Sequence, residues 1–248
     1  KRFSTPPTTI FSTAPTRSEC SSRRALWTRT GISLLISRGP STKSDTVRNE
    51  ISKNLLPVTV HSGLHLKNPV FKRMSFHDKL KQVIRGINYE EPKIVQSMYI
   101  FKQPKIGGAV TDHIDATFLF VEPIDHLVGL WIAVDDADEE NGCLAFIPGS
   151  HKRSSVDYRF VRTHKTDGSP LLKFTGERPT YDQSKFVSVP VKKGSLIIIH
   201  GLVVHKSEPN TSTKSRHAYT LHIMEGKNTK WSPDNWYENN SKLFHSLQ

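Results

Sequence analysis

The chain has 248 residues and a formal net charge of +12. This length suits one good-sized domain or two small ones. No stretch approaches the ~20 apolar residues that a membrane-crossing helix needs, so we expect no membrane span. Cys20 and Cys143 are too few for a disulfide framework or a cysteine-based zinc site.

The positive charge is concentrated at the start of the chain. Residues 1–60 contain ten Lys or Arg and three Asp or Glu, a net charge of +7, and the other 188 residues carry only +5. A mildly basic domain with a basic leading segment does not require a polyanionic partner. Basic residues interleaved with stacking aromatics, which are typical of single-strand binders, are not found. We therefore expect no nucleic-acid partner.

Residues 1–60 form a basic segment that we expect to lie outside the folded domain. In residues 1–43, Ser, Thr, Pro and Arg fill 26 positions and no apolar period is visible, so this part should not build a core. The composition fits a disordered tail or a mitochondrial transit peptide. We expect a cytoplasmic location, or a mitochondrial one if the segment is a genuine transit peptide.

A third interpretation of this segment, and the one we favour, is translation in the wrong frame. Residues 24–39 can be back-translated so that the neighbouring frame reads FVDKDGNLLVDKQ. That alternative has acids, an Asp-Gly turn and an apolar run, as a globular protein should. An uninterrupted transcript frame that encodes residues 1–60 would exclude it.

From residue 61 the sequence is typical of a globular domain, predicted to span residues 61–237 and to be followed by a tail at 238–248. Apolar residues at mainly helical spacing predict an amphipathic helix over residues 70–87. Runs rich in β-branched and aromatic residues predict seven strands, at residues 94–101, 109–121, 127–134, 143–147, 186–191, 195–204 and 216–224.

Turn signals separate these strands. Residues 138–142, which end in Asn141 and Gly142, predict a hairpin. Residues 152–185 are polar and without period, and we expect them to form a long loop over one end of the molecule. Seven strands beside one flanking helix predict a mainly β fold, an antiparallel sandwich or jelly roll that closes over a central cavity.

The first candidate for chemistry is the pair His113 and Asp115. On a strand, residues i and i+2 project from the same face, so an imidazole nitrogen and a carboxylate oxygen can meet at one point. A His-x-acid pair is expected about once by chance in this composition. The pair therefore indicates a site only in combination with other residues.

A second imidazole and a cation follow downstream. His205 comes after an apolar run, and Arg216 opens the next predicted strand. Two His and one Asp on one face of a metal, with the other positions open, are the ligand set of non-haem iron(II) oxygenases. Arg can hold a carboxylate through two parallel hydrogen bonds. His200 is the rival of His205, and we interpret it as a satisfied histidine of the barrel.

Several motifs in order carry a family resemblance. They are MYIFKQ at residues 98–103, HID at 113–115, ENGCLAFIPGSH at 140–151, VHKS at 204–207, SR at 215–216 and WSPDNW at 231–236. Together they resemble the phytanoyl-CoA dioxygenase family, and within it the animal branch of phytanoyl-CoA dioxygenase domain-containing proteins. The resemblance covers roughly residues 61–237.

The resemblance implies a cupin-like double-stranded β-helix, iron(II) and the cosubstrate 2-oxoglutarate. The metal ligands and catalytic residues would be His113, Asp115 and His205. Arg216 would bind the far carboxylate of 2-oxoglutarate, and further cosubstrate contacts would come from Met98, Trp131 and Ser207. A lysine that the family has near Thr59 is absent here.

The function that follows is an iron(II)- and 2-oxoglutarate-dependent dioxygenase. It would hydroxylate a small or lipid-like molecule, release succinate and carbon dioxide, and accept ascorbate as an optional reductant. The alternative is a binding or scaffold protein that keeps the barrel without turnover. Neither the substrate nor the oligomeric state follows from the sequence. Five basic residues could steer an anionic substrate or simply form a solvated loop face: Lys152, Arg153, Arg159, Arg162 and Lys165.

Overall fold

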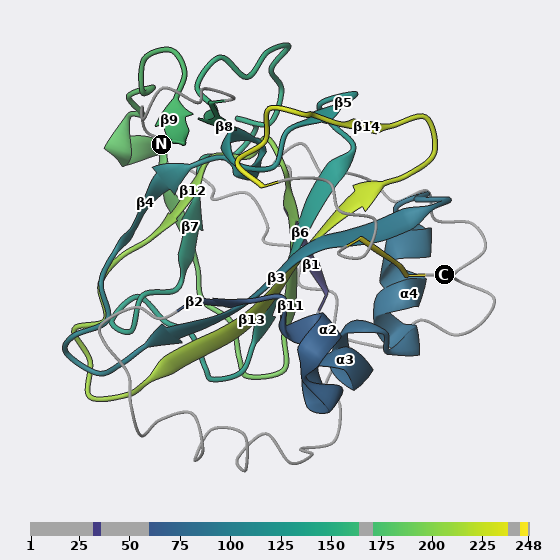
Figure 1. The fold of residues 1–248 in the computed structure, drawn as a ribbon. Coiled ribbons are helices and arrows are strands. Elements are labelled where there is room, and N and C mark those ends of the chain that lie inside the picture. The colour runs from purple at the N-terminus through teal and green to yellow at the C-terminus, as the bar shows by residue number, and fades with distance from the viewer. Residues whose placement is uncertain (1–31, 36–59, 164–170, 238–243, 248) are drawn as a thin grey trace, which may run out of the picture.

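The computed structural model describes residues 32–35, 60–163, 171–237 and 244–247. Its core is an antiparallel seven-stranded sheet. The strands, in spatial order, are β1 (Ile32–Leu35), β11 (Leu196–His200), β6 (Leu127–Ala133), β13 (Arg216–Glu225), β3 (Pro92–Lys102) and β15 (His245–Ser246), with β2 (Val60–Ser62) also paired to β3. Figure 1 shows this sheet crossing the molecule.

A second, four-stranded sheet faces the first. It contains β10 (Val187–Val189), β7 (Leu144–Phe146), β12 (His205–Ser207) and β4 (Val110–His113) in this order. Apolar side chains from both sheets share one core cluster, in which Trp131 and Ile197 of the large sheet meet Phe146 of the small one. The observed architecture is therefore the predicted mainly β, jelly-roll arrangement.

Three short helices cover the other face of the large sheet (Figure 1). They are α2 (Leu64–Lys67), α3 (Pro69–Ser75) and α4 (Asp78–Gly86). Phe71 and Ile84 pack there against Tyr219 and Leu221 of β13. Residues of β13 alternate between this helix layer and the inter-sheet space, which explains why the whole strand is buried.

The single helix predicted for residues 70–87 was wrong, because capping interrupts the apolar period. The Asn68 side chain accepts hydrogen bonds from the amides of Val70 and Phe71 and starts α3. The His77 imidazole then accepts from the Lys79 amide and starts α4 as a separate helix.

Three loop and strand predictions also need correction. The strand predicted for 109–121 ends at His113 and is followed by the 3-10 helix η2 (Asp115–Thr117) and by β5 (Val121–Glu122), which pairs with β14 (Lys230–Trp231). Residues 138–142 turn as predicted, but the strands that they join belong to different sheets, so they form no hairpin. The predicted loop 152–185 contains the pair β8 (Phe160–Arg162) and β9 (Leu172–Phe174), and the 3-10 helix η3 (Gln183–Lys185).

The two predicted end segments are partly integrated into the fold. β1 lies inside the segment 1–60 and pairs with β11, although the composition predicts no core there. Most of that segment lies outside the described residues. β15 lies inside the predicted tail 238–248 and pairs with β3, while Leu247 is 1% exposed and joins the core. In both β1 and β15, pairing with a neighbouring strand outweighs the weak strand signal of the local sequence. Among the described residues, no helix combines the length and the apolar character needed to cross a membrane.

Candidate metal centre

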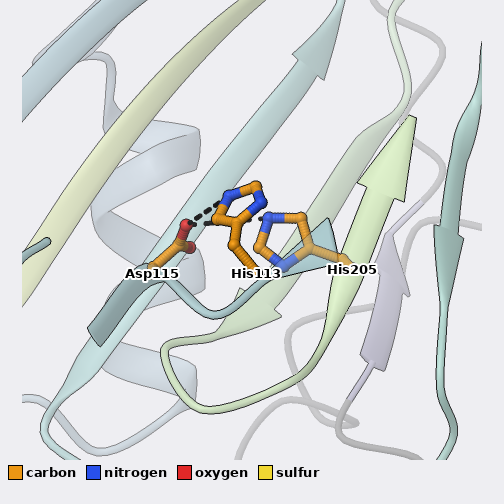
Figure 2. A group of neighbouring side chains, drawn as sticks. All are labelled: His113, Asp115 and His205. Atoms are coloured by element: carbon orange, nitrogen blue, oxygen red, sulfur yellow. Dashed lines mark ion pairs between the residues drawn. The ribbon is translucent and has the colours of Figure 1, made fainter. Parts of the chain in front are cut away.

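His113, Asp115 and His205 meet between the two sheets. His113 ends β4 and His205 begins β12, and the two residues lie directly opposite each other in this antiparallel pair. Asp115 opens the 3-10 helix η2. The Asp115 Oδ1 atom lies 3.7 Å from His113 Nε2 and 3.6 Å from His205 Nε2. Figure 2 shows the three side chains converging, and their candidate ligand atoms all lie within 4.8 Å of one another.

The sequence identified these residues for a reason that is only partly right. His113 and Asp115 do not share one face of a continuous strand. The strand ends at His113, and the turn of η2, in which the amides of Phe118 and Leu119 donate to the Asp115 carbonyl, brings the carboxylate back toward the imidazole. The convergence depends on this turn and on the pairing of β4 with β12.

Both imidazoles are oriented by backbone carbonyls. His113 Nδ1 lies 2.7 Å from the Thr111 carbonyl oxygen, and His205 Nδ1 lies 3.0 Å from that of Val203. A carbonyl can only accept, so each Nδ1 must donate its proton and each Nε2 presents a lone pair to the centre. This is the tautomer that a metal requires.

The protonation states of His205 and Asp115 also suit metal binding, whereas the raised pKa of His113 means that a metal there competes with a proton. Burial and the neighbouring His113 lower the pKa of His205 to about 4, so this ring is neutral at pH 7. Burial alone would lower the pKa of His113, but its hydrogen bond and attraction to Asp115 raise it. Burial alone would raise the pKa of Asp115, but His222, His205 and His113 hold it well below its usual range. The carboxylate is therefore ionised, and this buried negative charge calls for a cation.

A cavity of about 90 Å³ adjoins the three residues. All four predicted cosubstrate residues line it: Met98, Trp131, Ser207 and Arg216. The structure thus brings all seven predicted site residues together around one space.

Arg216 lines this space and is buried, with 1% of its surface exposed. Its Nε donates to the Gly142 carbonyl at 3.0 Å and its Nη2 donates to Ser207 Oγ at 2.9 Å. Its guanidinium carbon lies 5.5 Å from the centre of the Trp131 ring. Nη1 is buried without a hydrogen-bond partner, so one edge of the guanidinium still needs an acceptor.

A second buried cation, Lys102, was missed from the sequence. It lies opposite Arg216 in the pairing of β3 with β13. Its Nζ donates to Ser207 Oγ at 2.6 Å, to the Ser207 carbonyl at 3.1 Å and to the Glu208 carbonyl. Burial and the charge of Arg216 lower the pKa of Lys102 to about 7. The cross-strand register that joins the two cations could not be read from local pattern.

His222 was also missed, because nothing in its local sequence separates it from an ordinary surface or core histidine. Its Nε2 lies 3.4 Å from Oδ2 of Asp115, and it is 6% exposed. In β13 it lies on the same strand face as Arg216 and Thr220, and all three line the cavity. The sequence did carry a signal for His222: it follows Arg216 by an even number of positions in a predicted strand, so the two side chains should share one face.

The remaining candidates lie outside this group. The His200 ring is 5.2 Å from that of His151, and its Nδ1 accepts from the Leu202 amide at 3.1 Å, as expected of a satisfied barrel histidine. Two of the basic loop residues bind neighbouring structure: Arg159 donates to Ser232 Oγ at 2.8 Å and Arg162 donates to the Trp236 carbonyl at 3.3 Å. Lys165 lies outside the described residues.

Solved structures show the same fold. The non-heme alpha ketoglutarate dependent carbocyclase SnoK from nogalamycin biosynthesis superposes with a TM-score of 0.67 at 20% identity, over 95% of this chain and 100% of that one. The structure of EctD from S. alaskensis with 2-oxoglutarate and 5-hydroxyectoine superposes with a TM-score of 0.59 at 17% identity. This superposition covers 89% of this chain and 80% of that one. The double-stranded β-helix implied by the sequence is confirmed.

Sequence comparisons identify the family. A phytanoyl-CoA dioxygenase domain-containing protein 1 homolog of Caenorhabditis briggsae is 71% identical over 177 residues, which are 71% of this chain and 62% of the relative. Phytanoyl-CoA dioxygenase domain-containing protein 1 of Danio rerio is 51% identical over 186 residues, which are 75% of this chain and 63% of the relative. The chain thus spans about three fifths of the length of these relatives. The family model of phytanoyl-CoA dioxygenase matches residues 35–218, and the chain belongs to that family.

Proposed function

We propose that this chain is an iron(II)- and 2-oxoglutarate-dependent dioxygenase. The observation that carries the proposal is the convergence of two Nε2 atoms and one carboxylate oxygen within 4.8 Å, beside a cavity that Arg216 also lines. Two imidazoles and one carboxylate are the facial donor set of non-haem iron oxygenases. Membership of the phytanoyl-CoA dioxygenase family supports the same chemistry.

The residues present fit iron(II) and 2-oxoglutarate. His113, Asp115 and His205 would hold the metal, and Arg216 would receive the far carboxylate of 2-oxoglutarate at its unpartnered Nη1. When bound, iron(II) and 2-oxoglutarate together supply the activation of dioxygen that hydroxylates an unactivated C–H bond, with succinate and carbon dioxide as the coproducts.

The protein's own contribution is positioning and exclusion of water. Met98 and Trp131 would pack against the cosubstrate while the buried cations hold its charge. Ser207 Oγ accepts from both Lys102 and Arg216 and donates to the Gly142 carbonyl at 2.9 Å, so its orientation is set before any ligand arrives. Such preorganisation lowers the cost of orienting the reactants.

An apolar small or lipid-like substrate suits the surroundings of the metal ligands. The Phe118 ring centre lies 5.9 Å from that of His113. It also lies 6.1 Å from that of Phe160 and 6.3 Å from that of Phe174, on the β8–β9 pair. Phe174 is 45% exposed, which leaves an aromatic surface available next to the site.

The test is succinate production. The purified chain, given iron(II), ascorbate and 2-oxoglutarate, should release succinate slowly even without its substrate, through uncoupled turnover. His205→Ala should abolish this release, and His200→Ala, which removes a buried histidine outside the group, should retain it. No succinate from a folded protein that binds iron would refute the enzyme and favour the scaffold alternative.

A further inference from the structure

We propose that His222 is a positioning residue that binds the outer oxygen of Asp115 and so keeps this carboxylate a one-oxygen metal ligand. This role rests on the metal site proposed above. It concerns which positions around the metal stay open.

The two oxygens of Asp115 face different partners. Oδ1 faces the imidazoles of His113 and His205, at 3.7 and 3.6 Å from their Nε2 atoms. Oδ2 points the other way: it makes no hydrogen bond in this structure, and His222 Nε2 faces it at 3.4 Å, within ion-pair distance. A metal held by the first two histidines would therefore meet Oδ1, while Oδ2 is directed toward a donor of the protein.

His222 has little reason to be buried other than this contact. His222 belongs to β13 and has 6% of its surface exposed. Its Nδ1 is buried without a hydrogen-bond partner. A buried imidazole that makes no polar contact would be unfavourable compared with an apolar residue of similar size. The Asp115 carboxylate is its one ion-pair partner among the described residues.

The neighbouring strands are shaped to admit the pair. Gly129 of β6 lies opposite His222 in the strand register. A Cβ atom at Gly129 would lie 3.2 Å from Asp115 Oδ2 and 3.6 Å from His222 Cδ2, so any larger residue would press on the contact. On the other side, the register between β13 and β3 shifts immediately after His222. Such irregularities re-aim side chains next to active sites.

The consequence concerns the open coordination positions. A facial set of two histidines and one carboxylate oxygen leaves three positions, and 2-oxoglutarate and dioxygen need all of them. A carboxylate that rotated to bind through both oxygens would occupy one of these positions. By binding Oδ2, His222 opposes that rotation.

The experiment compares His222→Leu, which removes the donor at similar volume, with His222→Gln, whose amide nitrogen can replace Nε2. His200→Leu, another buried histidine on a core strand, is the matched control. The proteins are loaded with cobalt(II), whose visible spectrum reports coordination number. Affinities for cobalt(II) and, in the manganese(II)-loaded protein, for 2-oxoglutarate are measured by calorimetry.

We expect His222→Leu to bind cobalt(II) within about threefold of the wild type, because all three ligands remain. Its spectrum should change, and its dissociation constant for 2-oxoglutarate should rise roughly 10-fold or more, because loss of a partner that orients a metal ligand typically changes metal affinity or activity by about 10- to 100-fold. His222→Gln and His200→Leu should stay near the wild type. Gly129→Ala, which presses on Oδ2 with His222 in place, should change the spectrum in the same way.

An unchanged spectrum and unchanged 2-oxoglutarate affinity in His222→Leu would overturn the role of His222. So would equal defects in His222→Leu and His222→Gln, since packing would then explain both. If His222→Leu does not fold, the cobalt(II) spectrum and the 2-oxoglutarate affinity are measured in Gly129→Ala and His222→Gln instead. A wild-type spectrum in Gly129→Ala, or a defect in His222→Gln, would then overturn the role of His222. Failure of the proposed function is distinguishable, because it is read from the wild type alone: a folded wild type that binds metal would then release no succinate, whatever the spectra and affinities of the variants.

Discussion

The strongest quantitative prediction concerns Lys102 and the pH dependence of 2-oxoglutarate binding. Lys102 is fully buried, and its pKa is lowered to about 7 by burial and by Arg216. The other charged or titratable neighbours that influence it are Glu208 and Cys143. Burial raises the pKa of Cys143, so this thiol stays neutral, while Arg216, with a pKa lowered to about 10, stays charged near pH 7.

The magnitude follows from the contact through Ser207. Lys102 Nζ lies 2.6 Å from Ser207 Oγ. Ser207 Oγ also accepts from Arg216 Nη2, which links the lysine to the proposed anchor. For a carboxylate received at Arg216 about 5 Å from Nζ, Coulomb's law with an effective dielectric constant of about 20 gives about 3 kcal/mol. This corresponds to roughly two pKa units, so the bound anion would raise the pKa of Lys102 to about 9.

The sign follows from linkage. Binding of the anion favours protonated Lys102, so the affinity is full below pH 7 and falls as the pH rises through the window between the free and bound pKa values. The dissociation constant should rise about 40-fold from pH 6.5 to pH 9. Over this range 2-oxoglutarate remains a dianion, so its own charge does not contribute.

The assay is calorimetric titration of the manganese(II)-loaded protein with 2-oxoglutarate at pH 6.5, 7.5 and 8.5. Lys102→Met, similar in length and uncharged, should bind weakly at pH 6.5 and show little further change. Metal affinity, measured separately at each pH, controls for effects on the ligands. A wild-type dissociation constant that varies less than threefold, or an equal pH slope in Lys102→Met, would refute the reasoning.

Further predictions address the anchor, the core and the same lysine. Arg216→Lys keeps the charge but loses the planar fork, so the dissociation constant for 2-oxoglutarate should rise roughly 10- to 100-fold at unchanged metal affinity, and an unchanged value in calorimetry would argue against this anchor. Ile84→Ala, at a fully buried position of α4, should lower the free energy of unfolding by about 2–5 kcal/mol in urea, and a loss below about 1 kcal/mol would show that the helix layer adds little. Gly142→Ala should weaken both folding and 2-oxoglutarate binding, because φ is 82° at this residue and a Cβ atom would overlap the Glu208 carbonyl. A melting temperature and a 2-oxoglutarate affinity equal to those of the wild type would contradict this prediction. Between pH 7 and pH 9 the unfolded chain holds more protons at Lys102 than the folded one, so wild-type stability should rise with pH from this group, and an equal rise in Lys102→Met would assign it elsewhere.

The sequence alone selected the residues that converge at the candidate site. His113, Asp115, His205 and Arg216 could be selected because metal ligands and carboxylate anchors require particular residue types, and few side chains can replace them. The main core strands could also be predicted, because runs of β-branched residues such as Leu196–His200 fit a pleated surface that is buried on both faces.

Tertiary structure decided which other residues join that chemistry. Lys102 is brought to Arg216, and His222 to Asp115, by strand register and by the turn of η2. Register depends on partners far away in the chain, so no local period reports it. For the same reason β15 joins the large sheet although its sequence alone predicts a tail: its place is set by its pairing with β3.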